Sequence, residues 1–478
     1  MGIDTTPERG DAGSVRLSRR DLLKRSALGL GLLPTMSWRS LAALAQGPTH
    51  HTPTAKRMIV LFMSGGMSQL DLFDPKPLLN ERRGEDLPPS IRNGTKSSQL
   101  TERQGALAVV GSRFEFKRYG TSGLEMSELL PHIGGMADKL TLIRSLQTDH
   151  VLHEAAVTEL FTGTALLGRP SWGSWVSHAL GSANPNLPEF VVMLSSGDRL
   201  APLHPRLWHN GFLPGKHQGV FFRSKGAPVL YLDNPPGVDA TVRKKTLETI
   251  EALNGHEAER TAAAARIETR NKTYEMAARM QTSLPELAAL KEEPPEVLKR
   301  YGAEIGKPSF ANNCLLARRL VERGVRFVQL MDGAWDHHYN IPRVLPKKCG
   351  QVDRPIGALL GDLDERGLLD DTIVVMVGEF GRTPFCEGPL SFESYGRDHN
   401  GQAAGAIVAG GGFRQGFSYG KTDEWGWAAI DEKVHVHDLQ ATILHCLGFN
   451  HEKLTYRNRG RDFRLTDVGG RVIAPLLA

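Results

Sequence analysis

The stretch Met58-Ile59-Val60-Leu61-Phe62-Met63 is apolar at every position and ends at Ser64-Gly65-Gly66. A strand with one face in water alternates apolar and polar residues, so an unbroken apolar run favours a strand buried on both faces, as in a parallel sheet. Similar runs follow at residues 190–194, 325–330, 372–377 and 404–409. The pattern therefore predicts a buried, mostly parallel sheet.

Segments with helical periodicity lie between these runs. They are residues 127–136, 154–160, 314–323, 355–366 and 437–447. Strands that alternate with helices imply βαβ units, in which helices cover both faces of the sheet. The predicted fold class is α/β.

Residues 239–300 have a different composition, rich in Ala, Glu, Lys and Arg and poor in strand formers. We interpret this segment as a solvated helical insertion on the α/β core. A coiled-coil dimer seam is the alternative, but the heptads are not sustained. The oligomeric state stays open.

The first 45 of the 478 residues resemble an export signal. Arg19-Arg20 is a twin-arginine pair, a short apolar run follows, and Ala43 and Ala45 make a cleavage site before a linker at residues 46–56. A basic amphipathic helix is the alternative. Export through the twin-arginine machinery would deliver the folded protein to the periplasm or the medium. No apolar run reaches the ~20 residues that a membrane span requires.

The net charge also depends on this leader. The whole chain carries +5, but the leader holds seven basic and four acidic residues, which leaves +2 for the rest. The remaining charge argues against a nucleic-acid partner. The four cysteines are widely spaced and form no metal knuckle, so disulfides and buried free thiols both remain possible.

Candidate residues for a metal or anion site follow or precede the predicted strands, at the edge of the sheet where open α/β proteins bind ligands. They are Asp71, Asp336, His338, Glu379, Arg382 and His399. Taken singly, these residues have structural explanations: a capping aspartate beside surface histidines, a Glu379–Arg382 ion pair, and loop hydrogen bonds. Together, however, carboxylates and imidazoles at several strand ends favour a metal or anion site.

His150 and His153 lie at the predicted start of the helix over residues 154–160. The N-terminus of a helix offers free N–H groups and positive potential, which favour an anionic ligand. Either histidine would then contact a phosphate, sulfate or carboxylate group. Simple loop contacts are the alternative.

Several of these segments together resemble an exported bacterial family, the Domain of Unknown Function fifteen-oh-one family of the alkaline phosphatase and sulfatase superfamily. The resemblance rests on residues 65–77, 314–327, 335–338, 378–384, 396–399, 434–439 and 460–463. It spans nearly all of residues 57–478. It implies an alkaline-phosphatase-like three-layer sandwich and a sulfatase-like hydrolase that acts on small-molecule or glycan esters of phosphate or sulfate.

The resemblance also implies roles for individual residues. Asp336, His338 and His399 correspond to one site for a divalent metal (Zn, Mn or Ca), and Glu379 corresponds to a carboxylate of a second site. His153 falls at the position of the nucleophile. Arg382 is the other candidate catalytic residue.

Three positions depart from the family pattern. Gly65 stands where the first strand should end in a ligand aspartate, and Asp71 is the nearest substitute. Phe380 replaces a second-site histidine. His153 has neither hydroxyl nor thiol, so it would attack directly, act as general base, or mark a non-catalytic binding or structural protein on the same fold.

Overall fold

The computed structural model describes residues 49–92, 104–195, 204–223, 228–229, 233–260, 264–391 and 393–478. These residues belong to one compact unit, Gln46–Ala478. The export leader predicted at residues 1–45 lies outside the described residues, as does the start of the linker.

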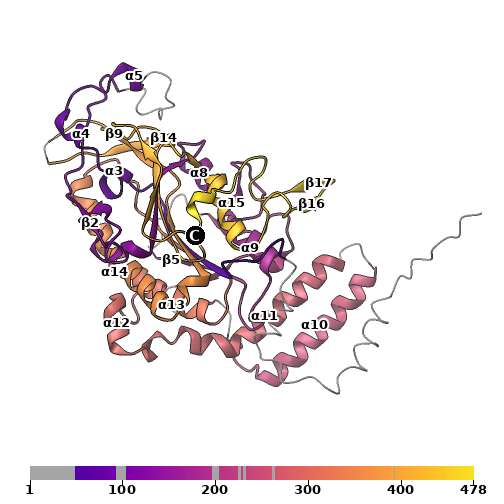
Figure 1. The fold of residues 1–478 in the computed structure, drawn as a ribbon. Helices are drawn as coiled ribbons and strands as arrows, with labels where there is room; N and C mark the ends of the chain where they lie inside the picture. Colours follow the sequence, from indigo (N-terminus) through magenta and orange to yellow (C-terminus); the bar gives the residue numbers. More distant parts are fainter. Residues whose placement is uncertain are drawn as a thin grey trace, which may run out of the picture. The chain divides into compact units, whose positions relative to one another are not determined.

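A nine-stranded sheet forms the centre of this unit (Figure 1). The strands are β1 (Arg57–Met63), β4 (Leu140–Gln147), β5 (Phe190–Leu194), β6 (Val220–Phe222), β7 (Phe327–Asp332), β8 (Thr372–Val377), β11 (Ala404–Ala409), β12 (Phe417–Tyr419) and β15 (Val434–His435). Their order is β12-β4-β11-β8-β1-β7-β5-β6, and β15 pairs with β4. Only β11 is antiparallel to its neighbours, which confirms the prediction of a mostly parallel sheet.

The strand register brings several carboxyl ends to one edge of the sheet. Met63 at the end of β1 is paired with Asp332 at the end of β7, and Phe62 is paired with Val377 at the end of β8. β4 runs in the same direction as β8, because both are antiparallel to β11. The segments that follow β1, β4, β7 and β8 therefore leave from the same edge.

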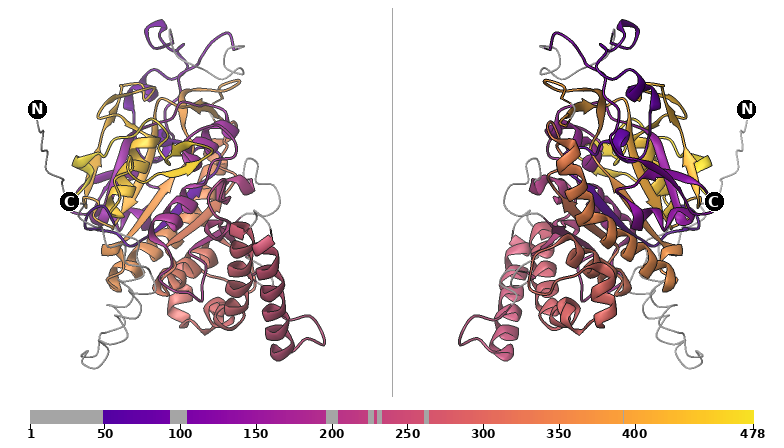
Figure 2. Two further views of the ribbon diagram at one scale, coloured as in Figure 1. Left: turned by 90° about the vertical axis from the view of Figure 1, so that its right-hand side faces the viewer. Right: turned by 90° about the vertical axis from the view of Figure 1, so that its left-hand side faces the viewer.

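Helices cover both faces of the sheet (Figures 1 and 2). One face packs against α7 (Pro131–Gly134), α13 (Phe310–Glu322) and α14 (Ile341–Glu365), and the other against α8 (His153–Thr162), α9 (Trp172–Leu180) and α15 (Val436–Cys446). Alternate β1 residues divide between the two cores: Leu61 joins the first and Val60 the second. The fold is thus a three-layer α/β sandwich, as predicted.

The segment around residues 239–300 is helical. It comprises α10 (Ala240–Arg260), α11 (Ala264–Ala288), η4 (Leu290–Glu292) and α12 (Pro295–Tyr301). Met280, Leu284 and Leu287 of α11 are buried in the first core, so the end of this helix is anchored to the sandwich. Val242 and Leu253 of α10 are exposed.

The remaining elements are short. They are α3 (Gln69–Leu72), α4 (Pro77–Glu81), α5 (Pro89–Arg92), β2 (Phe116–Tyr119), β3 (Leu124–Ser127), η1 (Ala137–Lys139), η2 (Pro205–Trp208), η3 (Gly215–His217), η5 (Leu369–Asp371), β9 (Gly381–Cys386), β10 (Arg397–Asn400), β13 (Lys421–Thr422), β14 (Ala429–Asp431), β16 (Tyr456–Asn458), β17 (Arg461–Phe463) and η6 (Ala474–Leu476). β9 and β10 pair with each other beside the sheet.

Two further properties concern the membrane and the thiols. Within the described ranges, no helix combines the length and apolar character that crossing a bilayer requires. All four cysteines are buried free thiols.

Candidate metal centre

Four side chains meet at the carboxyl edge of the sheet. His153 is the first residue of α8, after β4; Asp336 and His338 follow β7; and His399 lies in β10, before β11. One ligand atom from each residue lies within 4.8 Å of the others. Residues 246 positions apart in sequence therefore converge because the strand ends coincide.

Each histidine is held by its Nδ1 atom, so that its Nε2 atom faces the group. His153 Nδ1 lies 2.7 Å from Glu379 Oε1, and His399 Nδ1 lies 2.7 Å from the carbonyl oxygen of Val151. His338 Nδ1 contacts Glu387 Oε2. Histidines that ligate metals are typically oriented in this way, by an acceptor on the far ring nitrogen.

The separations between the inward-facing atoms fit one small ion. Asp336 Oδ1 lies 2.8 Å from His338 Nε2 and 3.2 Å from His399 Nε2, and Asp336 Oδ2 lies 3.3 Å from His153 Nε2. Ligand atoms 2.0–2.1 Å from a tetrahedral zinc ion are about 3.3 Å from one another. His153 Nε2 is buried without a hydrogen-bond partner, which a bound cation would satisfy. The residues present therefore fit a metal ion.

The local charges couple the carboxylate to the imidazoles. Burial alone would raise the pKa of Asp336, but the three histidines and Arg382 lower it well below the ordinary range. Burial also opposes protonation of His153 and His338, yet their carboxylate neighbours outweigh it and raise each pKa to about 9. For His399, burial dominates and lowers the pKa. Three basic imidazole side chains therefore surround one carboxylate.

Arg382 braces this site from inside the protein. Its side chain is 1% exposed, and its Nη2 atom lies 2.5 Å from Asp336 Oδ1. The same guanidinium donates to the carbonyl groups of Gly65, Gly66 and Arg397. These contacts make Arg382 a residue that positions Asp336.

Glu379 lies behind His153, away from the point that the four ligand atoms share. Its carboxylate accepts hydrogen bonds from the backbone N–H groups of Gly65 and Gly66, at 3.0–3.1 Å, in addition to its contact with His153. The side chain is fully buried. The structure therefore places Glu379 as the residue that orients His153, and it does not join the four converging ligand atoms.

Asp71 is not brought to the group. Its carboxylate pairs with Arg397 Nε at 2.8 Å and accepts hydrogen bonds from Ser68 and Tyr395. Asp71 and Arg397 are both fully buried. The expectation that Asp71 substitutes for the missing first-strand ligand is corrected, because both of its oxygens are occupied by this structural network.

The other two departures from the family pattern, Gly65 and Phe380, are explained by how closely the neighbouring groups pack. Gly65 has φ +121°, and a Cβ atom there would lie 2.4 Å from the backbone nitrogen of Asp336. The Phe380 ring packs against His153 and His399, with centroids 5.0 and 4.4 Å away. Glycine at position 65 lets the Asp336 loop approach, and the Phe380 ring stands where the family resemblance implies a second-site histidine.

Glu387 and the carbonyl group of Val151 are the parts of the site that the sequence did not reveal. Glu387 directly follows β9, and its Oε2 atom contacts His338 Nδ1. A backbone carbonyl leaves no trace in the residue pattern. For Glu387, the only available signal was its position shortly after residues 378–383.

Several solved structures are similar to this chain at low identity. The PsFucS1 sulfatase from Pseudoalteromonas sp. is 11% identical, with a TM-score of 0.34 over 88% of this chain and 73% of that chain. A protein of the alkaline phosphatase superfamily from Vibrio parahaemolyticus is 11% identical, with a TM-score of 0.34 over 91% and 76%. The phosphonate monoester hydrolase SpPMH from Silicibacter pomeroyi is 13% identical, with a TM-score of 0.29 over 88% and 76%.

No curated protein matches the sequence. A family model does: the one described as "Protein of unknown function (DUF1501)" matches residues 55–477. This match covers almost the whole of the described unit, and the chain belongs to that family.

Proposed function

We propose that this protein is an exported, metal-dependent hydrolase of phosphate or sulfate esters. The observation that carries the proposal is the convergence of His153, Asp336, His338 and His399 on one point beside the N-terminus of α8. The export step rests on the twin-arginine pattern in the leader, and export would bring the protein to the periplasm or the medium.

The ligand set favours a transition metal. Three imidazole nitrogens and one carboxylate oxygen suit zinc or manganese, whereas calcium prefers an all-oxygen shell. A divalent ion held there would act as a Lewis acid that stabilises the negative charge developing on the ester oxygens. Asp336 has a 40% exposed side chain, so the site is open to a substrate from solvent.

The N-terminus of α8 supplies a second feature that suits an anionic ester. The N-cap residue Leu152 provides no side-chain acceptor for the N–H groups of the first turn. Uncapped N–H groups and the helix dipole bind phosphate and sulfate oxygens. The ester would therefore lie between the metal-binding group and the start of α8.

We assign separate tasks to the surrounding side chains. His153 would hold the metal through Nε2, because Glu379 fixes its Nδ1 and leaves the other nitrogen facing Asp336. Arg382 keeps the Asp336 carboxylate in place. Neither residue needs to form a covalent bond to the substrate in this scheme.

A non-catalytic binding protein on the same fold is the second candidate. The observation in its favour is that the position expected for a nucleophile carries His153, whose two ring nitrogens both face carboxylates. A site of this kind would bind an anionic ester without turning it over.

Hydrolysis assays distinguish the two candidates. Purified protein is incubated with p-nitrophenyl phosphate and p-nitrophenyl sulfate, each with zinc, manganese or calcium. We expect turnover of one ester, reduced at least about a hundredfold in His399→Ala, in line with the loss of a metal ligand. His209→Ala is the matched control, because His209 is exposed and outside the group. Metal-loaded protein without turnover supports the binding protein, and turnover unchanged by His399→Ala contradicts the assigned site.

A further inference from the structure

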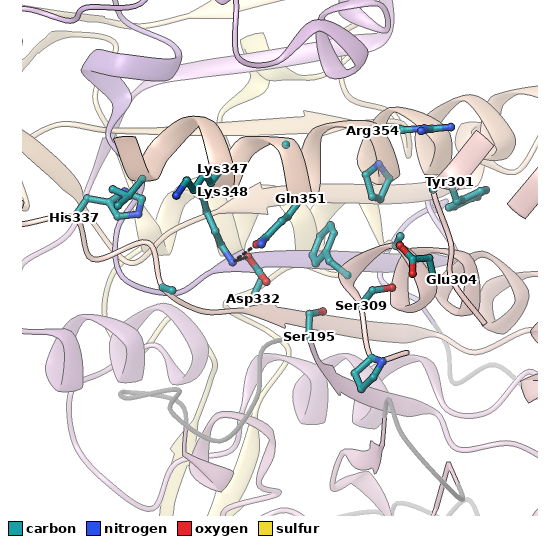
Figure 3. Close-up of a pocket in the computed structure, with 18 of the residues that line it drawn as sticks. Ser195, Tyr301, Glu304, Ser309, Asp332, His337, Lys347, Lys348, Gln351 and Arg354 are labelled. Carbon is teal, nitrogen blue, oxygen red and sulfur yellow. Dashed lines mark hydrogen bonds and ion pairs between the residues drawn. The ribbon is translucent and has the colours of Figure 1, made fainter. Parts of the chain in front are cut away.

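A cavity of about 860 Å³ adjoins the metal centre (Figure 3). Figure 3 shows His337 at one end of the lining residues and Tyr301 and Arg354 at the other. Asp336, the neighbour of His337 in sequence, also lines the cavity. Asp336 is therefore shared by the cavity and the candidate metal site. A ligand whose reactive group lies at Asp336 has the rest of its length available along this cavity.

One face of α14 forms a long wall of the cavity. Val344, Lys347, Gln351 and Arg354 line it at intervals of three or four residues, which is the spacing of a single helix face. From Val344 to Pro355, this wall is about 16 Å long at 1.5 Å per residue. Its length favours an extended occupant over a compact one.

Two positive charges on this wall are uncompensated. Lys347 is exposed and, within the part of the chain that the structure describes, has no carboxylate partner. Among the described residues, Arg354 donates only to the backbone carbonyl groups of Lys299 and Arg300, which carry no charge. Seven residues along a helix separate the Cα atoms of Lys347 and Arg354 by about 10 Å along the helix axis.

The other charged groups that line the cavity have partners of opposite charge, among them Asp336, which pairs with Arg382. Lys348 Nζ lies 2.6 Å from Asp332 Oδ2, and Glu304 pairs with Lys307 at 2.5 Å. The unbalanced charge of the wall is therefore positive. It favours a ligand that carries at least two anionic groups along its length, and each charge pair is stronger at low salt.

The side chains that line the cavity distinguish between two kinds of anionic chain, an acidic oligosaccharide and a single-stranded nucleic acid. Ser195, Ser309 and Gln351 offer hydroxyl and amide groups that suit sugar hydroxyls. Tyr301 and Phe310 are 0% and 4% exposed, so their rings are closed to stacking against bases. Single-stranded nucleic acids bind largely through such stacking.

We propose that this cavity binds an acidic oligosaccharide, whose anionic groups pair with Lys347 and Arg354 while its ester lies at the metal centre. The inference rests on the proposed function for the position of the ester. Binding along α14 itself depends only on the cavity.

Binding of a labelled, heparin-derived hexasaccharide tests the proposal. We expect a salt-sensitive affinity at least about tenfold higher than that for inorganic sulfate. Lys347→Ala/Arg354→Ala should weaken it at least about tenfold, the effect expected from two lost charge pairs. Lys421→Ala/Lys453→Ala is the matched control, because both lysines are exposed and outside the cavity. Circular dichroism verifies that each variant is folded.

The outcomes separate the two proposals. Equal binding of neutral maltohexaose, tighter binding of a single-stranded DNA hexamer, or an unchanged affinity in the Lys347/Arg354 variant would overturn the inference. If the protein hydrolyses no ester but hexasaccharide binding still depends on Lys347 and Arg354, the oligosaccharide proposal stands and the hydrolase proposal is wrong. If the protein hydrolyses an ester but does not bind the hexasaccharide, the hydrolase proposal stands and the oligosaccharide proposal is wrong.

Discussion

His338 Nε2 and His399 Nε2 face each other at 3.1 Å. The Nδ1 atom of His399 donates to the carbonyl group of Val151, and that of His338 lies against the Glu387 carboxylate. A neutral imidazole that donates through Nδ1 carries a lone pair on Nε2. Two lone pairs at this distance require a proton or a cation between them, and the fourfold group makes a metal ion the better explanation.

Removing the metal should therefore destabilise the fold. A chelator should lower the melting temperature, and zinc at about a hundred times its Kd should restore close to 3 kcal/mol of stability. Differential scanning fluorimetry measures both shifts. His399→Ala should show neither shift, and a chelator effect of equal size in that variant would contradict the assignment.

Glu379→Gln should weaken metal binding about tenfold to a hundredfold, because the amide holds His153 less firmly than the carboxylate does. Titration with a competing zinc chelator gives the affinity. Glu452→Gln is the matched control, since Glu452 is exposed and distant from the group. Equal affinities in the two variants would show that Glu379 does not orient a ligand.

Gly65→Ala should cost about 3 kcal/mol of folding stability, from the positive φ and the close contact with the Asp336 backbone. Gly123→Ala is a matched control, because Gly123 also has a positive φ (+66°) but nothing lies within 4 Å of its added Cβ. That change should cost only about 1 kcal/mol. Urea denaturation compares them, and equal costs would exclude a role for the close contact.

Asp71→Asn should destabilise the protein by about 3 kcal/mol at pH 7, because Arg397 would lose its buried partner. Burial raises the pKa of Asp71, but Arg397, Ser68 and Tyr395 outweigh it and lower the pKa below the ordinary value. A lowered pKa contributes stability that is fully present above the unfolded pKa of about 3.9 and is lost as the pH falls below it.

The pH profile gives the check for Asp71. The difference in unfolding free energy between the wild type and Asp71→Asn should be constant from pH 5 to about pH 8 and shrink below about pH 4. A difference that grows in acid would contradict the buried ion pair.

The sheet was predictable because burial on both faces leaves continuous apolar runs, and all five predicted strands are present. β4 (Leu140–Gln147) escaped prediction because Thr141, Arg144 and Ser145 interrupt its apolar run. The helix expected at residues 355–366 begins at Ile341, since the fold accommodates Pro346 and Pro355 inside α14. The helix predicted at residues 127–136 is reduced to α7.

Position beside the end of a predicted strand identified residues of the site. It did not distinguish the side chains that face the metal position from those that hold them in place. Asp336, His338 and His399 converge with His153, whereas Glu379 and Arg382 stand behind them. Asp71 follows its strand in the same way and yet points into a buried network. Residue type and position relative to a strand do not fix where a side chain points, because this depends on partners far away in sequence.

Metal stoichiometry tests the central claim most directly. Inductively coupled plasma mass spectrometry of purified protein, with His209→Ala as the control, should find about one zinc or manganese ion per chain. The same measurement on Asp336→Asn and His399→Ala should find almost none. A wild-type protein without a transition metal after incubation with zinc, or one whose metal survives both substitutions, would contradict the account.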